Sequence, residues 1–360
     1  MKGNPTRDIT CLAHIMISSQ PIQNSIEILY HNTGVVIPVY FPQEIDTSCG
    51  EQLLYNTVAS YAHHVADPAA ICLSVDGADF GAGIAAQLAG EFGVRNEVSP
   101  VNRGKLHSAE MGIRSLLGNQ MLRYLTVVDQ DGDHFANELL NMIHAAESIR
   151  SNLGSERVLV LGQRRSRHHP MGFYRGELEE LADRILLDAL GYHAAVSGTP
   201  LRLEYANSIA EFPDFHSGYK LFDRTTATLV FTSKPQRAGV SDRCYYHHAC
   251  EAVMTVEALL HQAYLATVQR STTNEQAVST FNLYGNSRLT ADMIIWPCKR
   301  LGVPLPFVRQ WLANHIPRLL LYTLAPEGKN LLEEIQQLVI GAFTGNPGKP
   351  ETVQFKPPFL

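Results

Sequence analysis

Short apolar runs with strand-like composition alternate with amphipathic helical segments through the first 162 residues of this chain. The apolar runs are rich in Val, Ile and Leu, and the segments between them carry apolar residues at helical spacing. This alternation is typical of βαβ units, which build a mostly parallel sheet with helices on both faces. The predicted strands are 34–40, 69–75, 97–101, 124–128 and 157–161, and the predicted helices between them are 51–66, 83–92, 106–117 and 137–150.

The second half of the chain is predicted to be more helical, without an internal repeat. Residues 177–190, 249–268 and 330–342 have helical periodicity, and residues 226–231 resemble a strand. We expect one α/β domain with a helical extension rather than two independent domains. The expected parts are a lead-in segment over 1–33, the catalytic domain over 34–270, a helical C-terminal extension over 271–345 and a Pro-rich tail over 346–360.

The composition excludes several classes of protein. Of the 360 residues, 45% are hydrophobic and only 18% are charged, so the chain can bury a large core. A net charge of −6 does not favour a nucleic-acid partner. The chain has no apolar run of the roughly 18 to 20 residues that cross a bilayer, and no signal peptide is apparent. These features predict a cytoplasmic enzyme without a transmembrane segment.

Polar residues follow three of the predicted strands, and we expect them to meet at one edge of the sheet. Asp76 follows the second strand, residues 102–105 follow the third and residues 129–134 follow the fourth. Ligands of open α/β sheets bind outside the carboxyl ends of the strands. The pattern therefore predicts one binding site there.

Asp129, Asp131 and Asp133 alternate directly after the fourth strand. Three carboxylates this close repel one another unless protons or a cation neutralise them, and a hard divalent ion is their natural partner. An EF-hand is excluded because His134 and Leu140 stand where Gly and Glu are required. A haloacid-type phosphatase also begins with Asp-x-Asp-Gly, but its usual Thr is Asp133 here and its second acidic motif is missing. A solvated acidic turn is the remaining alternative.

Six short motifs occur in consistent order between residues 34 and 260. They are 35–40 ending Pro-Val-Tyr, 74–77 ending Asp-Gly, Asn-Arg-Gly-Lys at 102–105, Asp-Gln-Asp at 129–131, Gly-Gln-Arg-Arg at 162–165 and Asp-Phe-His-Ser-Gly-Tyr-Lys at 214–220. In this order they resemble GT-A glycosyltransferases of the family-2 kind, and the closest likeness is to the polyprenol-phosphate glycosyltransferases of the dolichol-phosphate mannose synthase type. Two departures are the absence of transmembrane helices and Phe41-Pro42 in place of the family's Asn-Glu.

The resemblance implies a GT-A fold and transfer of a sugar, with inversion, from a UDP- or GDP-linked donor to a hydroxyl or phosphate acceptor. It implies Mg²⁺ or Mn²⁺ at Asp129 and Asp131, and Asp133 is a further competent ligand. Asp214 is the first candidate for the general base and Glu257 the second. The residues expected to contact the nucleotide are Pro38, Tyr40, Asp76, Asn102, Lys105, Asp129 and Arg165.

Several alternatives stay open at this stage. A nucleotide-sugar-binding protein without turnover would have the same motifs. The basic run 164–169 could face the diphosphate or form an exposed loop. The segment from Cys244 to Cys250 could bind zinc or be a buried cluster, and His247 or His248 could add a metal ligand.

The apolar segment from Leu301 to Leu324 bears on the acceptor. It could lie on a membrane surface, form a homodimer contact or pack on the catalytic domain. We expect packing, because three prolines shorten any continuous helix and the net charge is negative. A small-molecule acceptor is therefore expected ahead of a lipid phosphate.

Overall fold

The computed structural model describes residues 22–43, 46–206, 211–272 and 286–345. Of the expected lead-in segment, residues 22–32 form a helix that precedes the first strand, and residues 1–21 lie outside the described part. The expected Pro-rich tail, 346–360, also lies outside it.

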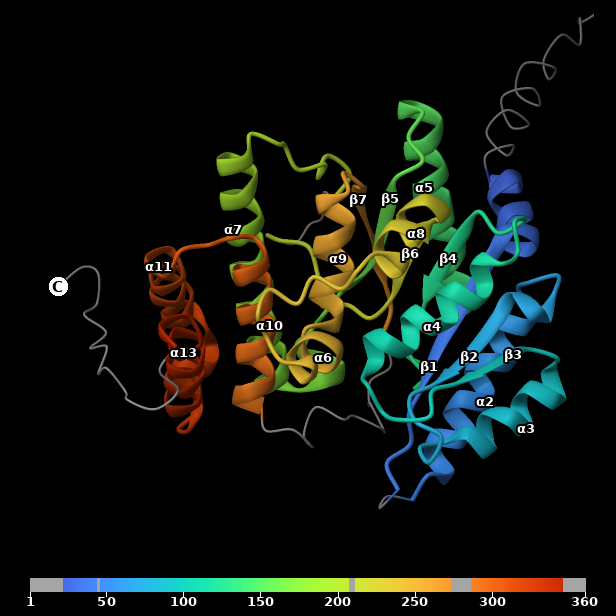
Figure 1. Cartoon of the computed structure of the whole chain (residues 1–360), viewed down its shortest axis with the longest axis horizontal. Helices are drawn as coiled ribbons and strands as arrows, with labels where there is room; N and C mark the ends of the chain where they lie inside the picture. Colours follow the sequence, from blue (N-terminus) through green and yellow to red (C-terminus); the bar gives the residue numbers. More distant parts are fainter. Residues whose placement is uncertain (1–21, 44–45, 207–210, 273–285, 346–360) are drawn as a thin grey trace, which may run out of the picture.

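A seven-stranded sheet with the order β3-β2-β1-β4-β6-β5-β7 forms the centre of the molecule (Figure 1). All pairs of neighbouring strands are parallel except those of β6, which runs antiparallel to both β4 and β5. The expected α/β class and mostly parallel sheet are therefore confirmed. The strands are β1 (Thr33–Val39), β2 (Ile71–Val75), β3 (Arg95–Val98), β4 (Tyr124–Val127), β5 (Val158–Arg164), β6 (Lys220–Asp223) and β7 (Tyr264–Arg270).

Helices cover both faces of the sheet, which explains why its central strands are continuously apolar. In β1, Val35 and Ile37 belong to one buried cluster and Val36 belongs to the other. The first cluster lies under residues 22–32, α2 (Ser48–Ala62), α3 (Ala82–Phe92) and α5 (Leu139–Leu153), and the second under α4 (Lys105–Leu117), α7 (Phe173–Ser197), α8 (Arg224–Thr232) and α9 (Cys250–Leu260).

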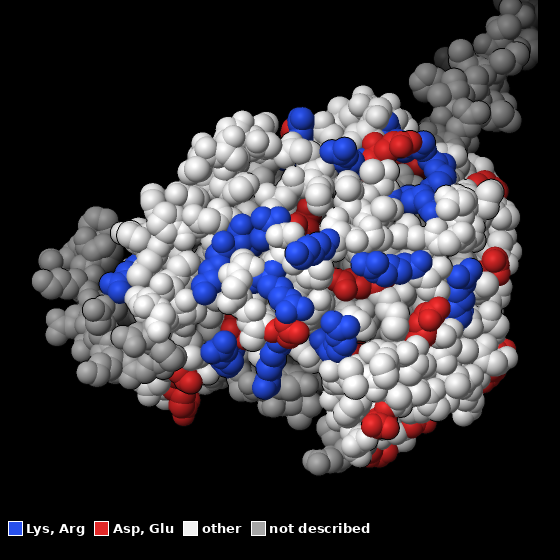
Figure 2. All heavy atoms as spheres, viewed as in Figure 1, with Lys and Arg blue, Asp and Glu red and all other residues white. Residues whose placement is uncertain are grey.

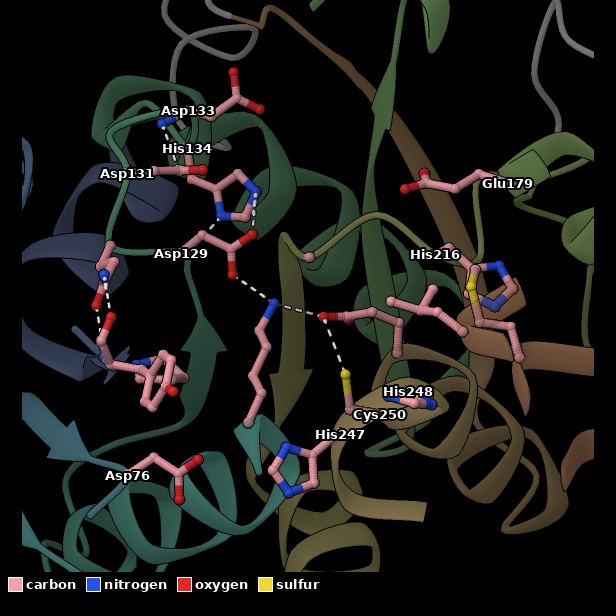
Figure 3. A pocket seen from close by; sticks show the side chains of 18 of the residues that line it. Asp76, Asp129, Asp131, Asp133, His134, Glu179, His216, His247, His248 and Cys250 are labelled. Atoms are coloured by element: carbon pink, nitrogen blue, oxygen red, sulfur yellow. Dashed lines mark hydrogen bonds and ion pairs between the residues drawn. The ribbon is translucent and has the colours of Figure 1, made fainter. Parts of the chain in front are cut away.

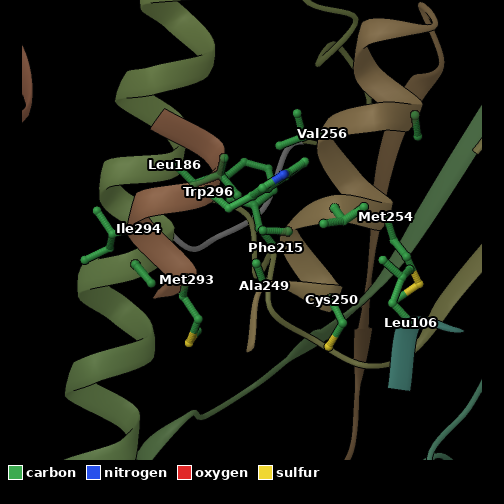
Figure 4. Close-up of a cluster of buried hydrophobic side chains, with 14 of the residues drawn as sticks. Leu106, Leu186, Phe215, Ala249, Cys250, Met254, Val256, Met293, Ile294 and Trp296 are labelled. Atoms are coloured by element: carbon green, nitrogen blue, oxygen red, sulfur yellow. The ribbon is translucent and has the colours of Figure 1, made fainter. Parts of the chain in front are cut away.

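The C-terminal helices continue the second cluster. Trp296 is fully buried, and Figure 4 shows it between Leu186 of α7 and Val256 of α9. Its indole N–H donates to the Gln236 carbonyl (3.0 Å). The helical character expected of this part is thus confirmed. The helices are α10 (Asn286–Arg300), α11 (Leu305–His315), α12 (Leu320–Leu324) and α13 (Gly328–Thr344).

The segment from Leu301 to Leu324 packs on the domain, as expected. Val308 and Leu312 are fully buried in the second cluster, whereas Phe307 is 46% and Leu324 68% exposed. Among the described helices, none has the length and apolar character needed to cross a bilayer.

Two predicted elements are wrong. Residues 226–231 lie in helix α8, because Asp223 caps this helix by accepting hydrogen bonds from the N–H groups of Thr225 and Thr226. The predicted helix 249–268 ends at Leu260, and residues 264–270 form strand β7 instead. Because α9 is buried on almost every side, its apolar pattern did not show where the helix stops.

Charged side chains on one face are clustered but mixed in sign. Figure 2 shows Lys and Arg gathered near the middle of this face, with Asp and Glu between them, and wide uncharged areas around them. This agrees with the low charged fraction of 18%. The face shown is not the continuous basic surface that nucleic-acid binding uses.

The half-buried Glu110 of α4 predicts a pH-dependent stability. Burial raises its pKa to about 7, although Arg114 and Arg103 oppose the shift. Because the folded value exceeds the ordinary value of 4.5, stability is lost as pH rises from about 4.5 to 7. We expect Glu110→Gln to unfold a few degrees above the wild type at pH 8 and at nearly the same temperature at pH 4.5. Thermal unfolding of both proteins across this range checks the prediction, and a pH-independent difference would contradict it.

Candidate active site

A cavity of about 280 Å³ lies at the carboxyl ends of β1, β2 and β4 (Figure 3). It stands where the sequence predicted a site, because the polar segments after these strands converge there. Helix α10 also reaches it through Leu289 and Met293. The predicted site residues that line the cavity are Pro38, Tyr40, Asp76, Asn102, Lys105, Asp129, Asp131 and Asp133.

Four charged groups alternate in sign at the cavity, and three of them, Lys105, Asp129 and Glu251, line its wall. Lys105 Nζ lies 2.5 Å from Asp129 Oδ1 and 2.6 Å from Glu251 Oε1. Lys220, which is fully buried in β6, donates to Glu251 Oε2 (2.7 Å). Burial would lower the pKa of Lys105, but Asp129 and Glu251 outweigh it and raise that pKa well above its ordinary value. Lys105 therefore presents a permanent positive charge to the cavity.

Asp129 is held by its surroundings in the ionised form. Its backbone N–H donates to His134 Nδ1 (2.9 Å), so the neutral ring carries its proton on Nε2, 3.8 Å from Asp129 Oδ2. Burial opposes ionisation, but Lys105 and then His134 outweigh it and lower the pKa of Asp129. The absence of a side chain at Gly218 leaves room for the Asp129 carboxylate, because a Cβ at Gly218 would lie 2.5 Å from Asp129 Oδ2.

The other two carboxylates that follow β4, those of Asp131 and Asp133, differ in their surroundings. Burial and the negative charge of Asp129 raise the pKa of Asp131 to about 7. Asp133 is buried, and its Oδ2 accepts a hydrogen bond from Arg270 Nη1 (2.9 Å). Arg270 lies at the end of β7 and was not predicted as a site residue from the sequence. Of these two carboxylates, the ionised form of Asp131 is therefore the one that a nearby cation would stabilise more.

The donor set fits a divalent ion that arrives with phosphates. Mg²⁺ is usually held by one or two carboxylates together with substrate phosphate oxygens, and Asp129 and Asp131 supply that number. Asp133 is instead engaged by Arg270. Among the described residues, the three-residue group whose ligand atoms all lie within 4.8 Å is His168, Glu177 and Glu180, away from this cavity.

Asp76 shapes the loop before α4. Its two carboxylate oxygens accept from the backbone N–H groups of Arg103 (2.8 Å) and Gly104 (2.9 Å). Gly104 has φ +109°, and a Cβ there would lie 2.5 Å from the Tyr246 carbonyl oxygen. Asp76 therefore positions Asn102 and Lys105 at the cavity while forming part of the wall itself.

Gln130 joins the ends of β1 and β4. Its Oε1 accepts from the Tyr40 backbone N–H, and its Nε2 donates to the Tyr40 carbonyl, both at 2.9 Å. This reciprocal pair lies where the strand order changes direction, between β1 and β4. Crevices at such switch points are the usual ligand sites of these sheets.

The structure does not support Asp214 as the general base. Its side chain is fully buried, and its Oδ2 and Oδ1 accept from Arg164 Nε and Nη2, both at 2.6 Å. Burial opposes ionisation, but Arg164 and then Arg167 outweigh it and lower the pKa of Asp214. Asp214 is absent from the cavity wall. We interpret it as a residue that positions Arg164.

Two further predicted site residues also lie outside the cavity wall. Glu257 is buried and receives two hydrogen bonds from Arg300, at 2.7 and 3.0 Å. Arg165 is exposed, whereas its neighbour Arg164 ends β5, lines the cavity and pairs with Glu179 (2.7 Å). The arginine that reaches the cavity is therefore the last residue of β5, and the predicted Arg165 lies just beyond the strand.

The segment from Cys244 to Cys250 has the character of a buried cluster. Cys244 Sγ is directed at the Asp292 carbonyl (3.7 Å), and burial raises the pKa of Cys250 to about 12. Neither thiol belongs to a described three-ligand group. Most of this segment lies in a π-helical turn, Arg243–His248, which brings His247 and His248 to the cavity wall.

Comparisons with known proteins give little further information. No family model matches the sequence, and no curated protein matches it. Among solved structures, the chain is similar to the crystal structure of S. aureus TarS 1-349. The TM-score is 0.39 with 12% identity, over 90% of this chain and 95% of that chain.

Proposed function

We propose that this protein is a metal-dependent glycosyltransferase that moves a sugar from a nucleoside-diphosphate donor to an acceptor, with inversion. One observation carries the proposal. Asp129 and Asp131, at the end of β4, share a single cavity with Lys105, Asp76 and the end of β1 at the switch point of the sheet. This combination suits a ligand with both a nucleoside and a diphosphate.

The roles of the residues follow from their positions. Pro38, Tyr40, Asp76 and Asn102 line the part of the cavity that suits the nucleoside, and Lys105 supplies a charge-assisted donor for a phosphate oxygen. Asp129 and Asp131 would hold Mg²⁺ or Mn²⁺, which as a Lewis acid neutralises charge on the departing diphosphate. Together these groups bind and orient the donor and stabilise its leaving group.

A thermal-shift screen of nucleoside diphosphates tests the proposal. We expect UDP or GDP to raise the unfolding temperature with Mn²⁺ present and much less without it, because a ligand that binds only the folded state stabilises it by mass action. A ligand at about 100 times its Kd adds about 2.7 kcal/mol. The matching UDP- or GDP-sugar should then be consumed.

Other results would point elsewhere. Metal-dependent nucleotide binding without consumption of any donor would indicate a binding protein. Hydrolysis of phosphate esters without nucleotide affinity would indicate a phosphatase. No stabilisation by any nucleoside diphosphate would contradict the proposal.

A further inference from the structure

A buried histidine–aspartate pair forms part of the same cavity. His216 lies in the segment before β6, and its Nδ1 is 2.7 Å from Asp183 Oδ1 on α7. The His216 backbone N–H also donates to this oxygen (3.2 Å). Asp183 is fully buried and His216 is 6% exposed. The ring is therefore fixed in one orientation.

The hydrogen bond to Asp183 decides the tautomer of His216. A carboxylate can only accept, so Nδ1 carries the proton and the neutral ring has its lone pair on Nε2. This Nε2 is buried and has no hydrogen-bond partner among the described residues. The ring lines the cavity, and Figure 3 shows it with Glu179 on the opposite side from Asp129. An unpartnered buried acceptor of this kind is costly and suits a donor brought by a ligand.

We propose that His216 Nε2 is the general base of this enzyme, positioned by Asp183, and that the acceptor is an alcohol. The inference rests on the proposed function. The acceptor O–H proton passes to Nε2 while the oxygen bonds to the anomeric carbon of the donor sugar. The bond from that carbon to the diphosphate oxygen breaks, and its electron pair leaves with the nucleoside diphosphate.

The acceptor class follows from the same chemistry. A phosphate acceptor is already an oxyanion at neutral pH and needs no base to become a nucleophile, whereas an alcohol does. A preformed acceptor nitrogen in the wall therefore favours a hydroxyl compound over a lipid phosphate.

Three other basic groups that line the cavity are engaged by neighbouring side chains. Glu179 accepts from Arg164 and Arg175, which outweigh the effect of burial and lower its pKa to about 2. Glu251 lies between Lys105 and Lys220. His248 Nδ1 is 2.7 Å from Asp292 and its Nε2 faces Arg243 Nε at 3.4 Å.

His216→Gln and a matched control variant test the inference. The control is His315→Gln, because His315 Nε2 pairs with Asp188 (2.6 Å) outside the cavity wall. The probes are UDP-glucose and GDP-mannose with Mn²⁺, with water and then glycerol as the hydroxyl acceptor. We expect His216→Gln to lower kcat about 10²- to 10⁴-fold without changing the donor KM or the nucleotide thermal shift. His315→Gln should match the wild type, and added imidazole should restore part of the rate to His216→Ala.

The outcomes separate this inference from the proposed function. Wild-type turnover with an undiminished kcat in His216→Gln would overturn the base while the glycosyltransferase stands. A wild type that neither binds nucleotide nor consumes a donor would overturn both.

Histidine ¹⁵N NMR of the wild type gives a readout that needs neither activity nor a stable variant. For the neutral ring of His216, a protonated Nδ1 and an unprotonated Nε2 are expected. The opposite tautomer would overturn the inference.

Discussion

Replacing Asp131 by alanine is expected to abolish sugar transfer while the protein stays folded. In the proposed function, Asp131 is one of the two carboxylates that would hold the metal. Losing Lewis-acid stabilisation worth several kcal/mol corresponds to a decrease in kcat of about 10³-fold or more. The free energy of unfolding without metal should stay equal or rise, because removing one of three crowded carboxylates relieves repulsion with Asp129 and Asp133. Turnover at saturating Mn²⁺ and thermal unfolding without metal measure the two effects.

Asp242→Ala is the matched control for this experiment. Asp242 is an exposed aspartate that pairs with Arg237 on the surface and does not line the cavity. It should change neither turnover nor metal-dependent nucleotide binding. Wild-type activity in Asp131→Ala at saturating Mn²⁺ would remove the metal assignment.

The first half of the fold could be predicted mainly from its central strands β1, β2 and β4, which are buried along nearly their whole length, whereas the edge strand β3 is polar and only partly buried. A parallel strand covered by helices on both faces must be apolar at nearly every position, as Val35 to Val39 are, so a short apolar run marks it directly. The carboxyl ends of such strands must meet at one edge. That geometry brings Asp76, Lys105 and Asp129 into one cavity, as their positions after the strands predict.

The errors arose where tertiary contacts decide the local structure. Strand β7 is parallel to β5 over Val158–Arg164, and this pairing overrides a helical pattern that runs on from α9. Helix α10 lies in the part that was expected to be helical, but its bounds were not predicted. Pro297 within it disfavours a helix in isolation. Burial of α10 against α7 and α9, through Trp296, supplies the stabilisation of the helix that its own sequence does not provide.

The residues of the site that the sequence missed come from elements remote from the acidic motif. Glu179 lies on α7, Arg270 ends β7 and Met293 lies on α10, and none belongs to a recognisable motif. His216 lies in the segment 214–220, in which the resemblance favours Asp214 as the general base. Only the three-dimensional structure shows that Asp214 faces Arg164 while His216 faces the cavity.

Asp214→Asn is expected to destabilise the protein by about 3 kcal/mol or more, which is the effect of breaking a buried ion pair by removing one partner. Arg164 is only 7% exposed, and the change replaces one of its carboxylate partners by a neutral amide. Glu179 is then the carboxylate that still pairs with Arg164. Urea unfolding measures the loss.

Two further variants make this result interpretable. Asp242→Asn removes a charge from the exposed pair with Arg237 and should shift stability by less than about 1 kcal/mol. The double variant Arg164→Met/Asp214→Leu should recover part of the loss, because replacing both charges leaves none buried and unpaired. If Asp214→Asn instead keeps wild-type stability and loses only kcat, Asp214 acts in the reaction itself. Because Asp214 is buried against Arg164, we expect the opposite result: the free energy of unfolding decreases, and any decrease in kcat is a consequence of the displacement of Arg164.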